Sequence, residues 1–237
     1  MKTSGTCQVK KGLLRCKYFM EISYLGHSSF KIKTKDATLV TDPFDPKEVG
    51  IKYPITDADV VTISHGHSDH NYLERIRGYR KVITEPGEYE LANISIIGLP
   101  SFHDAKNGEE RGRNIIYVFE IEEMRIAHLG DLGQKLSDKM LEEIGEIDIL
   151  MISSGHPMSL PAKDAVEIVR AIEPEIILPM HYKREGQNAP TLSNLETVDA
   201  FLKEAALPVE RIPKLSVKIS DLSEEEQKVI LLEIKEK

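Results

Sequence analysis

Residues 65–70 read His-Gly-His-Ser-Asp-His and place three imidazoles and one carboxylate within six positions, directly after an apolar run. Burying several histidines together is costly, whereas a divalent metal ion turns each neutral ring nitrogen into a bonded ligand. A histidine cluster without a metal is the alternative. Gly66 and Ser68 are small, and we expect them to allow a tight turn that directs the neighbouring side chains inward. The segment predicts a metal site that contains His65, His67, Asp69 and His70.

Four ligands in one turn cannot all reach a single tetrahedral ion with sensible geometry. The natural division places His65 and His67 on one ion and Asp69 and His70 on a second, so two metal ions are expected. Each site needs at least one more protein ligand, and the ends of apolar strands are the places to find it. Three residues of ligand type end such runs, although any one alone would more often be an ordinary core or surface residue: His103, Asp131 and His181.

Elements that position these residues follow from hydrophobic periodicity. Strands are predicted over 20–25, 29–35, 37–41, 59–64, 81–84, 93–98, 114–121 and 124–129, with a short helix over 72–78. The second half alternates helix and strand: helices over 134–144, 162–172 and 194–206, and strands over 147–153, 175–180 and 228–234. Ser193 and Glu196 predict a capping box at the start of the last helix.

Composition indicates a single soluble domain. The chain has 237 residues, 41% of them hydrophobic, and a net charge of −8, which disfavours nucleic-acid binding. No apolar stretch is long enough for a membrane span, and the two cysteines lie within the first nineteen residues, so a reducing cytoplasm is the expected location. Residues 1–19 carry five basic and no acidic residues and are predicted to be an extension of a domain over 20–237. A homo-oligomer is compatible with the sequence.

The ordered motifs His-x-His-x-Asp-His, a lone His, Gly-Asp and a second lone His resemble those of the metallo-β-lactamase superfamily. Residues 25–30, 41–43 and 179–182 resemble more narrowly the branch that contains L-ascorbate-6-phosphate lactonase and related Zn-dependent hydrolases. This resemblance implies an α+β fold, a four-layer αβ/βα sandwich, with the metals in a cleft at one edge of the two sheets. It also implies the ligand roles: His65, His67 and His103 on the first metal, Asp69, His70 and His181 on the second, and Asp131 between them.

The expected function is a metal-dependent hydrolase. Two divalent ions, Zn²⁺ or alternatively Mn²⁺, can lower the pKa of a shared water to about 7 and supply hydroxide for attack on an ester-type bond of a small molecule, such as a lactone, ester or phosphodiester. Asp69 and His181 are the candidate catalytic residues. The alternatives are a nucleic-acid phosphodiesterase or nuclease, an iron-dependent oxidoreductase of the same fold, in which relatives place Glu where His67 stands, and a non-catalytic metal-binding protein.

Several further polar residues have two interpretations. His27 lies near the site or is a hydrogen-bonding turn residue, and Asp42 orients a ligating imidazole or begins a turn. His156 stands where the related branch typically has glycine, and it is either an added substrate contact or a neutral replacement. Tyr182 contacts substrate or packs in the core. His128 is expected to be structural. The loop 104–113 flanks a substrate or is a solvated turn, and its cations, Arg111 and Arg113, meet an anionic group of the substrate or are solvated.

Overall fold

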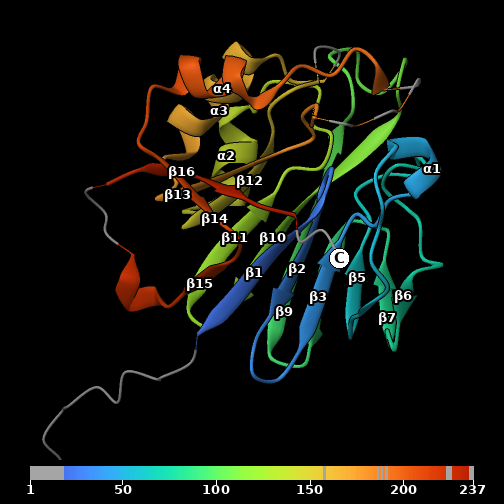
Figure 1. Cartoon of the computed structure of the whole chain (residues 1–237). Coiled ribbons are helices and arrows are strands. Elements are labelled where there is room, and N and C mark those ends of the chain that lie inside the picture. The colour runs from blue at the N-terminus through green and yellow to red at the C-terminus, as the bar shows by residue number, and fades with distance from the viewer. Residues whose placement is uncertain are drawn as a thin grey trace, which may run out of the picture.

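An antiparallel meander begins the fold in the computed structural model, which describes residues 19–156, 159–185, 187, 189, 192–222 and 226–234. Its strands are β1 (Met20–Gly26), β2 (Ser29–Lys33) and β3 (Thr38–Thr41). The sheet continues in parallel through β5 (Val60–Thr62) and β7 (Lys81–Ile83), and β15 (Leu215–Val217) pairs with β1 at the other edge. The result is a six-stranded sheet in the order β15-β1-β2-β3-β5-β7 (Figure 1).

A second sheet has eight strands in the order β14-β16-β13-β12-β11-β10-β9-β8. Its antiparallel half consists of β8 (Gly87–Leu91), β9 (Ile94–Phe102), β10 (Arg113–Ile121) and β11 (Met124–His128). Its parallel half consists of β12 (Ile149–Ser153), β13 (Ile176–Met180), β16 (Lys228–Leu232) and β14 (Val209–Ile212). The connections from β11 to β12, from β12 to β13 and from β13 to β14 each contain a helix, the usual crossover between parallel strands, whereas the connection from β14 to β16 passes through β15.

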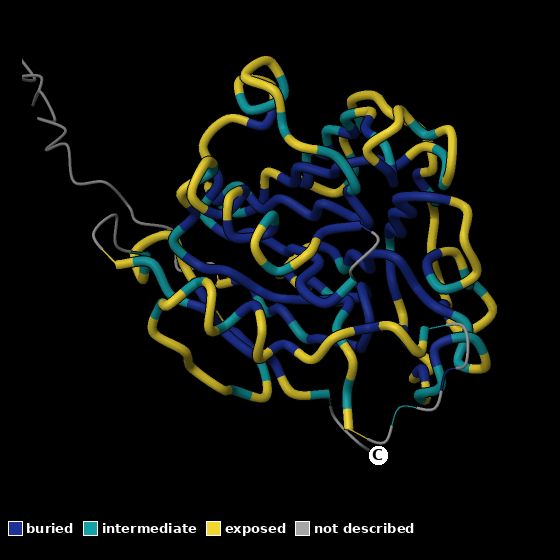
Figure 2. The backbone as a smooth tube through the Cα atoms, turned by 90° about the horizontal axis from the view of Figure 1, so that it is seen from above, coloured by how far each residue is buried: buried dark blue, intermediate teal, exposed yellow. Residues whose placement is uncertain are grey.

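Apolar side chains between the two sheets form the largest core, in which Phe30 and Ile32 of one sheet share a cluster with Tyr117 and Phe119 of the other. The outer face of the eight-stranded sheet is covered by α2 (Asp138–Ile144), α3 (Ala162–Ile172) and α4 (Val198–Ala205) (Figure 1). In Figure 2 the buried segments run through the middle of the molecule and the exposed ones lie at its periphery.

The outer face of the six-stranded sheet has a different cover. A third cluster, which includes Val40 and Val61, packs there against α1 (Pro46–Val49) and the small sheet of β4 (Thr56–Asp57) and β6 (Ile76–Arg77). The described part of the chain also contains one 3₁₀ helix, η2 (Ile219–Asp221). The predicted α+β sandwich is confirmed, with short elements and loops in place of long helices on this side.

Three predicted helices differ from the structure, and one of them, over 134–144, begins only at Asp138 after the N-cap Ser137. The segment 72–78 is not a helix but turns followed by β6, because Ile76 pairs with Thr56. The last helix begins at Val198 after the N-cap Thr197, so Ser193 and Glu196 form no capping box. Glu196 is instead held in extended pairing, since its N–H donates to Gly155 O at 2.7 Å and its carbonyl accepts from Lys183 N at 2.7 Å.

The predicted extension over residues 1–19 falls almost entirely outside the described residues, and the single domain over 20–237 stays a prediction. No helix in the described part of the chain combines the length and the apolar character that a bilayer crossing requires.

Candidate metal centre

The strand ends of both sheets meet at one edge of the sandwich. The segment 65–70 follows β5 of the six-stranded sheet, while His103, Asp131 and His181 follow β9, β11 and β13 of the eight-stranded sheet. Every residue predicted to bind metal is therefore brought to the same place. Side chains far apart in the sequence converge here because neighbouring strands of a sheet deliver their ends to a common crevice.

The first group of donors is His65, His67 and His103, whose ligand atoms all lie within 4.8 Å of one another. His65 and His103 are buried and His67 is exposed. Ser64 Oγ lies 2.9 Å from His65 Nδ1, and Ser159 Oγ lies 3.2 Å from His103 Nδ1. These hydroxyls hold the Nδ1 side of each ring, which leaves the Nε2 atoms directed into the centre.

The second group contains Asp69, His70 and His181, and the structure adds His27 to it, again with ligand atoms within 4.8 Å. Asp69 Oδ2 lies 3.1 Å from His27 Nε2, 3.6 Å from His70 Nε2 and 3.8 Å from His181 Nε2. The rings of His27 and His181 are stacked obliquely with centroids 3.9 Å apart. His27 therefore contacts the predicted ligands directly, and it also lies in the turn between β1 and β2.

Asp131 lies between the two groups. Its Oδ2 is 3.2 Å from His103 Nε2 of the first group and 3.4 Å and 3.1 Å from the Nε2 atoms of His70 and His181 of the second. This is the position that a ligand shared by two ions requires. Burial alone would raise the pKa of Asp131. The neighbouring His181 and His70 nevertheless hold this pKa well below its usual range, so the carboxylate is ionised.

The side chains present fit a pair of divalent cations. Among the described residues, Nε2 of His65, His70 and His181 and Oδ1 of Asp131 are buried without a hydrogen-bond partner, which is costly unless another group satisfies them. A cation among converging lone pairs supplies that partner. A mixed imidazole and carboxylate set without thiolates suits Zn²⁺ and Mn²⁺.

Asp42 fixes the tautomers of two of these rings. Its buried carboxylate accepts from Ser64 N at 2.7 Å and Ser64 Oγ at 2.5 Å, and Oδ2 lies 2.8 Å from His70 Nδ1. Because Ser64 Oγ donates to Asp42, it can only accept from His65 Nδ1–H. One carboxylate thus favours a proton on Nδ1 of both His65 and His70, so that a bound metal ion would meet Nε2 of each ring. The structure supports the orienting role of Asp42.

Three of these residues have left-handed backbone conformations, which residues other than glycine rarely adopt. The φ angles are +54° at His27, +36° at Asp42 and +55° at His181. His181 N donates to His27 O at 2.8 Å, and Asp42 N donates to Thr62 O at 2.9 Å, so backbone hydrogen bonds hold the strained residues in place. Such strain clusters at functional sites.

Sequence reasoning missed Asn114 and Gly133. Asn114 is buried and its Oδ1 accepts from Asp131 N at 3.0 Å, while its Nδ2 donates to Leu129 O at 2.9 Å. A polar residue at the start of the apolar run 114–121 was the available signal. A Cβ on Gly133 would meet His103 O at 2.3 Å, whereas one on Gly66 would meet nothing within 4 Å. Space therefore does not require the glycine between His65 and His67.

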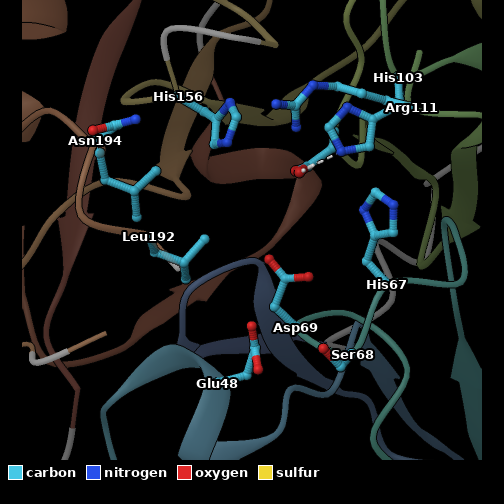
Figure 3. A pocket seen from close by; sticks show the side chains of 11 residues that line it. Glu48, His67, Ser68, Asp69, His103, Arg111, His156, Leu192 and Asn194 are labelled. Carbon is cyan, nitrogen blue, oxygen red and sulfur yellow. Dashed lines mark ion pairs between the residues drawn. The ribbon is translucent and has the colours of Figure 1, made fainter. Parts of the chain in front are cut away.

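A cavity of about 300 Å³ opens beside the donors (Figure 3). His67, Asp69, His103 and Asp131 are among its lining residues, and His156, Arg111 and Asn194 lie across from Asp69. Burial and, to a smaller extent, the neighbouring His181 lower the pKa of His156 to about 4. The ring is therefore neutral at pH 7.

Other predicted residues lie away from this cavity. Tyr182 is not among the described lining residues, and its ring stacks on Tyr24 with centroids 6.3 Å apart, which supports the packing interpretation. His128 is buried with Nε2 2.8 Å from Ser28 O, as expected of a structural histidine. Arg113 is exposed at the start of β10 and is not among the described lining residues either.

The comparisons with known proteins agree with this geometry. The family model of the beta-lactamase superfamily domain matches residues 21–181, which is more than half of the chain. The chain belongs to the metallo-β-lactamase superfamily. A superfamily protein of Thermotoga maritima, described as a candidate Zn-dependent hydrolase, is 36% identical, with a TM-score of 0.74 over 91% of this chain and 100% of that one.

Sequence relatives within the metallo-β-lactamase superfamily carry related names. A UPF0173 metal-dependent hydrolase of Methanopyrus kandleri is 27% identical over 81% of this chain and 95% of its own length. One of Carboxydothermus hydrogenoformans is 26% identical over 69% of this chain and 84% of its own length. The predicted class of metal-dependent hydrolase is confirmed at this level.

Proposed function

We propose that the chain hydrolyses an ester-type bond of a small molecule, a lactone, an ester or a phosphodiester, with two divalent metal ions. The observation that carries this proposal is the pair of donor groups with Asp131 Oδ2 between them, 3.2 Å from His103 Nε2 and 3.1 Å from His181 Nε2. His65, His67 and His103 would hold the first ion, and Asp69, His70 and His181 the second. Zn²⁺ or Mn²⁺ would lower the pKa of a water and stabilise negative charge that develops on the substrate oxygen.

In the proposed reaction, residues of the chain itself position the substrate and transfer the proton. The carboxylate of Asp69 lines the cavity and is held through Oδ2 by His27 at 3.1 Å. It can accept the proton of the attacking water as the water oxygen bonds to the carbonyl or phosphoryl centre, and return it to the leaving oxygen. His181 lies against both carboxylates and keeps Asp69 oriented toward Asp131.

Small-molecule substrates are favoured over nucleic acids. A cavity of about 300 Å³ is at the small end of ligand pockets, and the net charge of −8 opposes the binding of a phosphate backbone. Resemblance of residues 25–30 and 179–182 to the lactonase-containing branch adds lactones to the first substrates to test.

The test is a panel of lactones, aryl esters and phosphodiesters with protein loaded with Zn²⁺ or Mn²⁺. Asp69→Asn keeps the shape of the side chain and removes its charge, and we expect kcat to fall about 10²- to 10⁴-fold, the usual contribution of a positioned acid–base group. Asp59→Asn is the matched control, because Asp59 accepts from Thr38 N at the other end of β5. Hydrolysis that persists unchanged in Asp69→Asn would overturn the proposal.

A further inference from the structure

Arg111 brings a permanent positive charge to the cavity beside the donor groups. Its side chain extends over the cavity between His103 and His156 (Figure 3), and Glu48 of α1 lies at the opposite end. Arginine is the residue best suited to binding a carboxylate or a phosphoryl group, because its planar guanidinium can donate two parallel hydrogen bonds. This positive charge belongs to Arg111 and not to Arg113, which is exposed two residues later and is not among the described residues that line the cavity.

The loop that carries Arg111 is fastened to the candidate metal centre. Asp104 accepts from four backbone N–H groups: those of Lys106 at 2.8 Å, Gly108 at 2.9 Å, Glu110 at 3.1 Å and Arg111 at 2.7 Å. His103 N also donates to Gly112 O at 3.1 Å. The backbone of Arg111 is therefore fixed relative to a predicted ligand, and its side chain starts from a rigid base, which lowers the entropic cost of binding an anion.

We propose that Arg111, held by the Asp104 loop, forms a subsite for an anionic group of the substrate, a carboxylate or a phosphoryl group next to the bond that is cleaved. The inference rests on the proposed function and adds the class of substrate. His156, which lies beside Arg111, and Asn194, which lines the same cavity, contribute neutral hydrogen-bonding groups to this subsite. A neutral ester would fit the cavity but would not gain the charge-assisted hydrogen bonds that a guanidinium offers to an anion.

The test compares 4-acetoxybenzoate with 4-acetoxybenzamide, which have the same acyl group and nearly the same size but differ in charge. We expect the metal-loaded protein to prefer the anion in kcat/KM, and Arg111→Gln to lower that preference by about 10- to 100-fold, mainly through KM. Arg111→Lys should keep part of it, since the charge remains without the fork. A third ester, 4-acetoxyphenyl phosphate, separates phosphoryl from carboxylate recognition, and a preference for either supports the subsite.

Arg113→Gln is the matched control and should keep the wild-type preference. The proposal is overturned if Arg111→Gln retains the preference, or if Arg113→Gln loses it to the same extent. Calorimetric titration of the metal-loaded protein with 4-hydroxybenzoate keeps the test independent of turnover. If the wild type cleaves no ester, the proposed hydrolysis fails. Binding of 4-hydroxybenzoate that weakens in Arg111→Gln and not in Arg113→Gln would still support the subsite. Equal binding by the two variants would reject it.

Discussion

Replacing Asp42 with asparagine would change the hydrogen bond that fixes the ring of His70. Oδ1 of Asp42 accepts from Ser64 N at 2.7 Å, and an asparagine oxygen can keep this bond. The amide nitrogen would then stand where Oδ2 now lies 2.8 Å from His70 Nδ1. Two N–H donors would face each other unless His70 moved its proton to Nε2, the atom that lies 3.4 Å from Asp131 Oδ2.

Either arrangement weakens metal binding. An unsatisfied buried donor costs about 1–3 kcal/mol, which corresponds to roughly 5- to 150-fold in affinity, and loss of a group that orients a ligating histidine typically costs about 10- to 100-fold. We expect Asp42→Asn to bind one of its Zn²⁺ ions about 10- to 100-fold more weakly. Competition with a chromophoric chelator measures this affinity directly.

The control for this experiment is Asp59→Asn, which alters a carboxylate that accepts from Thr38 N at 2.9 Å at the other end of β5. Its Zn²⁺ affinity should equal that of the wild type. The role assigned to Asp42 is refuted if Asp42→Asn binds zinc as tightly as the wild type does, or if Asp59→Asn loses as much affinity.

Three further predictions concern the surroundings of the site. Gly133→Ala should destabilise the fold by about 1–3 kcal/mol in denaturant unfolding, because its Cβ would meet His103 O at 2.3 Å, whereas Gly66→Ala has open space and should be tolerated; equal stabilities would contradict the geometry. Four backbone N–H groups lower the pKa of Asp104 to about 2, so its contribution to stability is complete above about pH 4 and is lost as the pH falls through 2. Asp104→Asn should flatten the dependence of unfolding free energy on pH in this window, and an unchanged slope would refute the link. Burial opposes protonation of His70, but Asp131 and Asp69 raise its pKa well above the ordinary value, so Zn²⁺ binding near neutral pH should release a proton. Calorimetry in buffers of different ionisation enthalpy measures this proton, and binding heats that do not depend on the buffer would contradict the prediction.

Patterns along the chain located most of the strands, whereas the sandwich followed from the family resemblance and β8, β14 and β15 were not predicted. The helix over 162–172 and the strands around it follow from periodicity, and α3 has the predicted bounds. The segment 72–78 has an apolar spacing that also suits a helix, but the pairing of Ile76 with Thr56 decides its structure, and this contact is not visible in a local window. Likewise, the backbone of Glu196 is held by Gly155 and Lys183, so the helix starts later than its capping pattern suggests.

Residue types at strand ends predicted which side chains converge in the candidate metal centre. The sequence could not predict the direction in which these side chains point. The left-handed backbone at His27 turns its ring onto that of His181, at a centroid separation of 3.9 Å, and no spacing rule predicts this contact. The same holds for Arg111 and Arg113: of the two, Arg111 is among the described residues that line the cavity, on a backbone that donates to Asp104.

The position of the metal ions tests the account most directly. Crystals equilibrated with Zn²⁺ and measured at the zinc absorption edge should show two anomalous peaks at one edge of the sandwich. One should lie among His65, His67 and His103 and the other among Asp69, His70 and His181, with Asp131 between them. A map with no peak at these side chains, or with zinc bound only elsewhere on the chain, would contradict the dinuclear centre on which the proposed hydrolysis depends.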